Sequence, residues 1–427
     1  MLKKPFFSIG KPRLEYPVIQ DLNPGFEEGV PLPEMVTVYL DKPYSQDIEE
    51  FLKIGDSVKT GQKVAIDKED TFFLSPVTGF VSAIDEYIGY LGVKYTAIFI
   101  KTDAEEQEDD EIQAIKGAKT AENIVKFLSR LPGCPDFYSF VKNKYSFKTI
   151  IIEGTDDDLL VTTNQAVVER LTEDVREGIG ILKEITGAKK IFITAFPPSS
   201  SKVWGEKTAV IEIEPVYPGT LPQMVMKNKI KWVVPAGKKS EDLGVGFIKA
   251  EAVAALGAAV TRGKAPVEKI VTVIDKKGSV KNIKVRIGTP VKDILKHLNI
   301  DLEYGNRIVI GGPLRGKSIY TEDTPVLWDT DAILVQGAED IVQSMDAPCV
   351  NCGECVRACP ANIPVNMLVR LLENSLYTDA VQEYDLLSCI ECGLCAYVCK
   401  AQIPIFHYIM LGKNEYLKLK YMEESNA

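Results

Sequence analysis

The apolar residues of this chain change their spacing from one segment to the next. From residue 34 to 101 they form short runs between glycine-containing turns, the clearest of which are 55–62 and 75–81. Such runs are typical of strands, so this part is predicted to be a small all-β unit. From residue 120 to 265, β-branched runs alternate with stretches at helical spacing, which predicts an α/β sheet that places ligands beyond the carboxyl ends of its strands.

Individual elements can be placed within these segments. Strands are expected at 148–153, 191–194, 210–213, 231–234, 271–274, 283–287 and 307–310. Helices are expected at 162–186, 247–262, 291–298 and 365–376. The last part, 339–427, is predicted to be helical outside its cysteine clusters.

These patterns divide the chain into five parts. The acidic run 103–111 is expected to be an exposed linker without a site. The predicted boundaries are 1–102 for an N-terminal β domain, 103–119 for the acidic linker, 120–265 for a Rossmann-like α/β domain, 266–338 for a compact β-rich domain and 339–427 for a helical domain.

Charge and hydropathy limit the classes of protein to consider. The formal net charge is −10, which argues against a nucleic-acid surface. No apolar run is long enough for a transmembrane helix, and no apolar segment follows the first residues as in a signal peptide. We expect a cytoplasmic protein. The tail 405–422 mixes apolar residues with lysines, and predicts either a helix packed on the rest of the protein or an interfacial membrane helix.

The nine cysteines are distributed very unevenly. Cys134 stands alone, and the other eight lie between Cys349 and Cys399. Tight clustering of this kind indicates a metal site in a reducing compartment rather than a disulfide framework. The only histidines are His297 and His407, so a site built from several histidines is excluded.

Two cysteine motifs carry the chemistry. Residues 349–360 fit C-x2-C-x2-C-x3-C-P at every position, and residues 389–399 repeat the spacing with Lys400 in place of proline. This is the signature of two-cluster ferredoxins, in which the fourth cysteine of each motif serves the other cluster. The ligand sets are therefore predicted to be Cys349, Cys352, Cys355 and Cys399 for one [4Fe-4S] cluster, and Cys389, Cys392, Cys395 and Cys359 for the second. Structural zinc is the alternative, since CxxC pairs also bind zinc.

The order of these parts resembles the RnfC-like family, the C subunits of the Rnf electron-transport complex. The turns at 55–62 and 75–81 are similar to a barrel-sandwich hammerhead of the lipoyl and biotinyl type, in which Lys68 is the nearest candidate for a modified lysine. Residues 287–291 and 311–316 resemble the soluble-ligand-binding β-grasp (SLBB) domain of that family, and 389–393 resembles its second cluster motif. The resemblance implies a hammerhead, a Rossmann-like domain, a β-grasp domain and a helical twin-cluster ferredoxin-like domain.

The chain departs from the family where NADH-oxidising members hold FMN. Their glycine-rich loop corresponds here to residues 131–138, which contain one glycine and two prolines. Their acidic loop corresponds to 153–158, and their asparagine pair would fall near Ile248 and Lys249. These differences make FMN binding doubtful. Cys134 is either a redox thiol or a small buried hydrophobic residue.

We therefore expect an iron–sulfur subunit that relays electrons through two [4Fe-4S] clusters between redox partner proteins. The resemblance implies partners such as other subunits of a redox complex, a ferredoxin or a flavoprotein, and membrane attachment only through partner subunits at the inner face. The alternatives are an FMN-containing, NADH- or ferredoxin-linked oxidoreductase subunit and an adaptor that has lost the nucleotide site. No catalytic triad or carboxylate pair stands out in the sequence.

Overall fold

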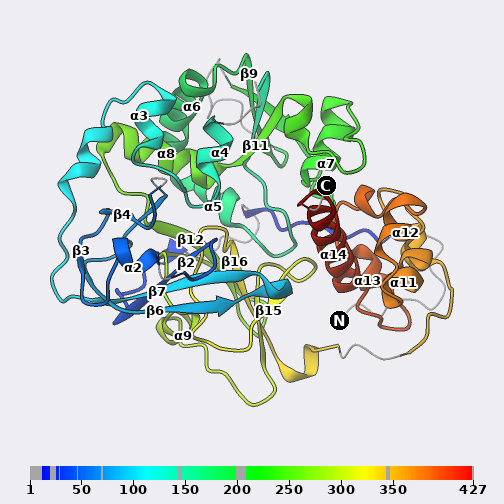
Figure 1. Ribbon diagram of the computed structural model, residues 1–427. Helices are drawn as coiled ribbons and strands as arrows, with labels where there is room; N and C mark the ends of the chain where they lie inside the picture. The colour runs from blue at the N-terminus through cyan, green and yellow to red at the C-terminus, as the bar shows by residue number, and fades with distance from the viewer. Residues whose placement is uncertain are drawn as a thin grey trace.

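The protein contains three sheet-based units and one helical lobe. In the computed structural model, the structure describes residues 12–19, 26–27, 29–45, 47–68, 71–142, 147–198, 208–342 and 347–425. Figure 1 shows the helical lobe, coloured orange to red, beside the sheet-based units. The architecture is thus mixed α/β with several domains.

The first unit is built on a four-stranded antiparallel sheet. Its strands are β2 (Met35–Leu40), β7 (Lys94–Thr102), β6 (Gly79–Ile88) and β3 (Ser57–Val58), in that order across the sheet. A hairpin of β4 (Lys63–Ala65) and β5 (Phe72–Leu74) packs with it, next to the short helix α2 (Ile48–Phe51). Lys68 lies between β4 and β5 and is exposed, with its Nζ 3.7 Å from a carboxylate oxygen of Glu50.

The acidic segment that follows is exposed, but it is fixed at both sides. Glu106 accepts a hydrogen bond of 2.8 Å from the Thr60 hydroxyl of the first unit. Its carboxylate also lies 2.9 Å from Arg286 of the third unit. The next turn, Asp110–Ile115, buries Ile112 and Ile115. The expectation of a plain linker was therefore incomplete, because this segment joins two units.

The second unit is a parallel sheet in the order β10 (Ala209–Glu212), β9 (Lys190–Ala195), β8 (Thr149–Glu153) and β11 (Val245–Lys249). It carries α3 (Ala121–Val125), α4 (Phe137–Lys142), α5 (Thr163–Arg170), α6 (Thr172–Thr186), α7 (Pro222–Val225) and α8 (Ala250–Arg262). Helices α6 and α8 approach closely at Gly178. A Cβ at this position would lie 1.9 Å from the carbonyl oxygen of Val253 in α8, so a side chain does not fit there.

Three element predictions in this unit were wrong in detail. The expected helix at 162–186 is two helices, separated at Leu171. Residues 231–234 form no strand; Trp232 and Val233 are exposed there, so no core holds them in a sheet. The fourth strand is β11 instead, which pairs with β8. It ends at Lys249, so the helix expected at 247–262 begins only at Ala250.

The third unit is a mixed sheet of six strands with one helix, α9 (Val291–His297). Its strand order is β1 (Phe26–Glu27), β13 (Val280–Arg286), β12 (Glu268–Ile274), β16 (Ala332–Gln336), β14 (Arg307–Ile310) and β15 (Lys317–Ser318). Strand β1 comes from the N-terminal region, so this region contributes to the third unit as well as to the first.

The helical lobe contains α10 (Glu354–Ala358), α11 (Val365–Glu373), α12 (Tyr377–Gln382), α13 (Leu394–Val398) and α14 (Ile405–Ser425). The first turns of α14 pack on the lobe through Ile405 and Ile409, while Leu417 and Tyr421 near its end are exposed. The packed-helix expectation therefore describes the first half of the tail. In the part of the chain that is described, no helix is both long and apolar enough to cross a membrane.

Candidate metal centre

The two cysteine motifs follow the same backbone path. Each has a left-handed residue two positions after its first cysteine, Asn351 at φ 52° and Glu391 at φ 58°. Each then has a left-handed glycine before its short helix, Gly353 at φ 74° and Gly393 at φ 71°. A side chain on Gly393 would also lie 2.3 Å from the carbonyl oxygen of Leu314. The repeated turns place the first three cysteines of each motif around one cavity.

The eight cysteines line two small cavities in two sets of four. One cavity is lined by Cys349, Cys352, Cys355 and Cys399. The other is lined by Cys359, Cys389, Cys392 and Cys395. The last cysteine of each motif thus lies at the cavity of the other motif. Helices α10 and α13 pack against each other. This packing places Cys359 at the cavity of the second motif and Cys399 at the cavity of the first.

Burial differs between the two cavities. Cys352 is exposed, whereas Cys392 and Cys395 are buried. Burial raises the pKa of Cys355 to about 11 and that of Cys392 to about 12, and the neighbouring cysteines add to both shifts. Thiols in these surroundings would ionise only with a strong positive partner, which a metal centre supplies.

Amide groups and side chains support the two motifs. The backbone N–H of Glu391 points to Cys389 Sγ at 3.4 Å, and that of Ile403 points to Cys399 Sγ at 3.4 Å. In the second motif, Lys413 Nζ donates to the carbonyl oxygen of Cys389 at 2.7 Å and also pairs with Glu391. The Tyr217 hydroxyl donates to the carbonyl oxygen of Cys392 at 2.6 Å.

These supporting residues were missed from the sequence. Arg315 Nε donates to the carbonyl oxygen of Glu391 at 3.1 Å, although 76 positions separate the two residues. Tyr217 and Cys392 are 175 positions apart. No local pattern marks either contact.

The region that corresponds to the flavin site of NADH-oxidising relatives is arranged differently. Leu131 and Cys134 exchange backbone hydrogen bonds of 3.0 and 2.8 Å, and the N–H of Gly133 donates to the carbonyl oxygen of Trp328 at 2.7 Å. These amides are therefore used within the chain. Burial raises the pKa of Cys134 to about 12, so its thiol stays neutral and packs against the core of the α/β unit.

The acidic loop after β8 is also used for internal contacts. Asp156 accepts hydrogen bonds from the backbone N–H of Asn164 at 2.7 Å and from Gln165 Nε2 at 3.1 Å. Asp158 accepts from the backbone N–H of Arg315 at 2.7 Å, which fixes the turn before β15. The carboxylates thus position α5 and this turn.

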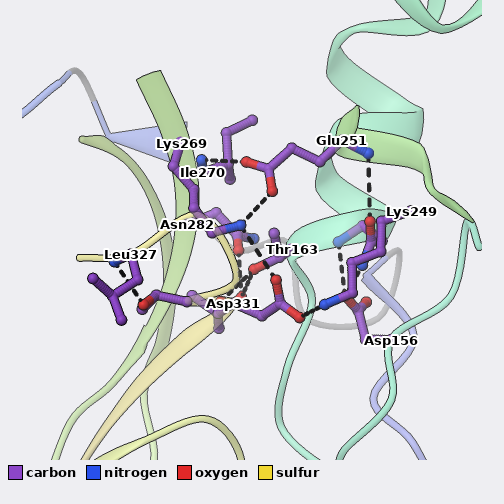
Figure 2. Close-up of polar contacts among 12 residues, drawn as sticks. Asp156, Thr163, Lys249, Glu251, Lys269, Ile270, Asn282, Leu327 and Asp331 are labelled. Carbon is purple, nitrogen blue, oxygen red and sulfur yellow. Dashed lines mark hydrogen bonds and ion pairs between the residues drawn. The ribbon is translucent and has the colours of Figure 1, made fainter. Parts of the chain in front are cut away.

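A chain of buried charges lies where the family pattern would place its asparagines (Figure 2). Lys249 at the end of β11 pairs with Asp331, which also lies 3.3 Å from Lys269. Burial opposes charge on both Lys249 and Asp331, but their attraction prevails, raising the pKa of Lys249 and lowering that of Asp331. Lys269 in turn pairs with Glu251 at 2.5 Å.

A cavity of about 640 Å³ lies where the four units meet. The first unit contributes Tyr39, Tyr87 and Tyr95, and the α/β unit contributes Asp157 and Lys249. Phe406 of the helical lobe lines both this cavity and the one that holds Cys389. The large cavity thus adjoins the second cysteine set.

Comparisons with known proteins agree with the motif. The family model for a 4Fe-4S dicluster domain matches residues 341–400. The chain is 26% identical over 362 residues to the C subunit of the ion-translocating oxidoreductase complex of Rhodobacter capsulatus, which covers 79% of this chain and 69% of that protein. It is 26% identical over 385 residues to the C subunit of the proton-translocating ferredoxin:NAD(+) oxidoreductase complex of Clostridium ljungdahlii, covering 84% and 83%.

A chain of an NAD+-reducing [NiFe]-hydrogenase is similar in structure, with a TM-score of 0.43 and 11% identity. That match covers 63% of this chain and 56% of the hydrogenase chain, so it spans little more than half of the latter. The resemblance to the C subunit of the Rnf complex is confirmed by relatives that cover about 80% of the chain, and the chain carries the 4Fe-4S dicluster domain of an iron–sulfur electron-transfer subunit.

Proposed function

We propose that this chain relays electrons between redox proteins through two [4Fe-4S] clusters with crossed ligands. Cys349, Cys352, Cys355 and Cys399 would hold the first cluster, and Cys389, Cys392, Cys395 and Cys359 the second. The observation that carries the proposal is that the eight cysteines line two cavities in these two sets.

When bound, each cluster supplies a centre that takes up and releases one electron at a time. The chain's own residues set the surroundings of that centre. Backbone N–H groups directed at the sulfurs of Cys389 and Cys399 stabilise negative charge there. Lys413 adds a positive charge at the second set and Arg357, which donates to the carbonyl oxygen of Cys352 at 2.9 Å, adds one at the first; each favours the more negative, reduced state.

The donor geometry favours a cluster over structural zinc. A zinc ion needs four donors within about 2.3 Å of one point. Among the described residues, no group of three or more histidine, cysteine or acidic side chains is close enough to hold a single ion. Four cysteines that line each cavity, in the spacing of a two-cluster ferredoxin, fit a [4Fe-4S] cluster.

The flavin alternative receives less support from the chain's residues. A flavin phosphate needs free backbone N–H groups or cations close to the glycine-rich loop. Here the amides of Gly133 and Cys134 are bonded within the chain, and Lys249 is paired with Asp331. We propose that the loop at 131–138 holds no flavin and that electrons enter from a partner protein.

The proposed partners follow from the relatives. By name, these are subunits of ion- or proton-translocating oxidoreductase complexes. We propose that this chain joins other subunits of a redox complex, acts at the cytoplasmic side, and reaches the membrane only through those subunits. The SLBB and hammerhead assignments of the third and first units belong to the same proposal.

The test is a spectrum and a metal analysis of the chain purified without oxygen. We expect about eight irons per chain and a broad absorption that dithionite bleaches. A colourless protein that contains zinc would contradict the proposal. Two resolved flavin bands would restore the alternative of an FMN-containing oxidoreductase subunit.

A further inference from the structure

An exposed basic loop lies beside the second cysteine motif. The loop comprises residues 227–239 and follows α7. It carries five exposed lysines, which are Lys227, Lys229, Lys231, Lys238 and Lys239. The chain has a net charge of −10, yet no aspartate or glutamate occurs from residue 215 to residue 240. This loop is therefore a local positive patch on an acidic protein.

The centre of the loop is apolar and open to solvent. Trp232 is 50% exposed and Val233 is 72% exposed. Lys231 has a left-handed backbone at φ 66°, which ends the preceding turn and leads into the two apolar residues. An exposed tryptophan with a charged rim is the usual composition of a protein-binding site.

The loop lies against the segment that leads into the second cysteine motif. A Cβ on Gly237 would lie 3.3 Å from Leu387, two residues before Cys389. Tyr217, which precedes α7, donates a hydrogen bond from its hydroxyl to the carbonyl oxygen of Cys392. Met224 of α7 packs in the same apolar cluster as Cys392. Figure 1 shows α7 above the helical lobe. A protein bound at the loop would thus lie beside the segment that carries Cys389, a proposed ligand of the second cluster.

From this juxtaposition we propose that the loop 227–239 docks an acidic electron-carrier protein, which exchanges electrons with the second cluster. The proposal rests on the proposed function, because the position has this meaning only when the second set holds a cluster. Lysines around a short electron path suit a partner that carries carboxylates around its own redox centre. A position beside the segment that carries Cys389 suits an electron carrier, which must approach a cluster to exchange electrons, better than a lipid surface.

The experiment uses the full chain with its clusters and a small acidic 2[4Fe-4S] ferredoxin as the probe. The variant replaces Lys227→Glu, Lys229→Glu and Lys231→Glu. The matched control replaces the exposed Lys183→Glu, Lys189→Glu and Lys190→Glu, which changes the net charge equally and lies around the C-terminal end of α6 and the start of β9. Binding is measured by calorimetry at two salt concentrations, and electron exchange by stopped-flow absorption.

We expect the loop variant to bind the ferredoxin at least about ten-fold more weakly and with a smaller salt dependence. Trp232→Ala should weaken binding about five-fold or more, since exposed aromatic anchors dominate such interfaces. The control should change binding by less than about two-fold. The rate of electron exchange should fall in the same order, while reduction by dithionite stays unchanged.

Three results would overturn the proposal: no binding by the unmodified chain, equal weakening in the loop variant and the control, or unchanged binding in the loop variant. Sedimentation of the unmodified chain with phosphatidylglycerol vesicles, lost in the loop variant while ferredoxin binding persists, would assign the loop to a membrane surface. Absence of clusters would refute the proposed function and with it the electron exchange. In a chain that holds its clusters, equal binding by the loop variant and the control would refute the docking site alone, because the calorimetric binding does not depend on electron transfer.

Discussion

The ammonium group of Lys269 lies 2.5 Å from the carboxylate of Glu251, and both side chains are almost completely buried. Lys269 belongs to β12 of the mixed sheet, and Glu251 to the first turn of α8 in the α/β unit. The other oxygen of Glu251 accepts a hydrogen bond of 2.7 Å from the backbone N–H of Ile270. This pair therefore fixes the second unit to the third (Figure 2).

Removing one partner of this pair should be costly. Lys269→Met is expected to destabilise the protein by about 3–5 kcal/mol, because Glu251 is left charged without its buried partner. Thermal unfolding followed by scanning fluorimetry measures the effect. The double variant Lys269→Met, Glu251→Gln should recover part of the loss, since the amide oxygen can still accept from Ile270. A loss below about 1 kcal/mol in the single variant would show that the pair does not hold the two units together.

Stability should fall as the pH rises through the pKa of Glu153. Burial, aided by the charge of Asp157, raises the pKa of Glu153 from 4.5 to about 8, and Oε1 has no hydrogen-bond partner in the structure. The folded state therefore keeps a proton that the unfolded chain has lost, so this contribution is complete below about pH 4.5 and is lost as the pH passes 8.

Glu153→Gln keeps the shape and removes the titration. The variant should match the unmodified protein near pH 5 and exceed it in stability near pH 9, by at least about 1 kcal/mol. The measurement is the melting temperature across this pH range. Parallel pH profiles for the two proteins would show that Glu153 does not titrate in the folded state.

Crossed ligation predicts which cluster each cysteine variant damages. Electron paramagnetic resonance of the reduced protein should show the same altered signal for Cys359→Ser as for Cys392→Ser. The matched variant Cys399→Ser should instead resemble Cys352→Ser. The reason is that Cys359 lines the cavity of the second set and Cys399 that of the first. The reverse pairing of the spectra would refute the crossed assignment.

The isolated chain should not accept electrons from NADH. With the amides of Gly133 and Cys134 bonded internally, no flavin is expected to mediate the transfer. NADH added without oxygen should leave the cluster absorption unchanged for minutes, while dithionite bleaches it in the same sample. Rapid bleaching by NADH would overturn the proposal that the loop at 131–138 holds no flavin.

The sequence alone determined the chemistry of the cysteine motifs. Their spacing is local, because three thiols two residues apart belong to one short loop whose path is set by left-handed residues such as Gly353 and Gly393. Strand positions in the sheets were also predictable where β-branched residues form a buried run, as in β8. The same reasoning failed at 231–234, because an apolar run with no core to cover it has no reason to pair.

Only the tertiary structure decided what surrounds the clusters and whether the flavin region is open. Tyr217 and Arg315 reach the second motif from other units, and their contacts span 175 and 76 positions of sequence. Lys249 could be taken from the sequence as a lost asparagine, but its pairing with Asp331 depends on how β11 meets the mixed sheet. Contacts between distant segments leave no periodic pattern, since each partner is placed by the packing of its own unit.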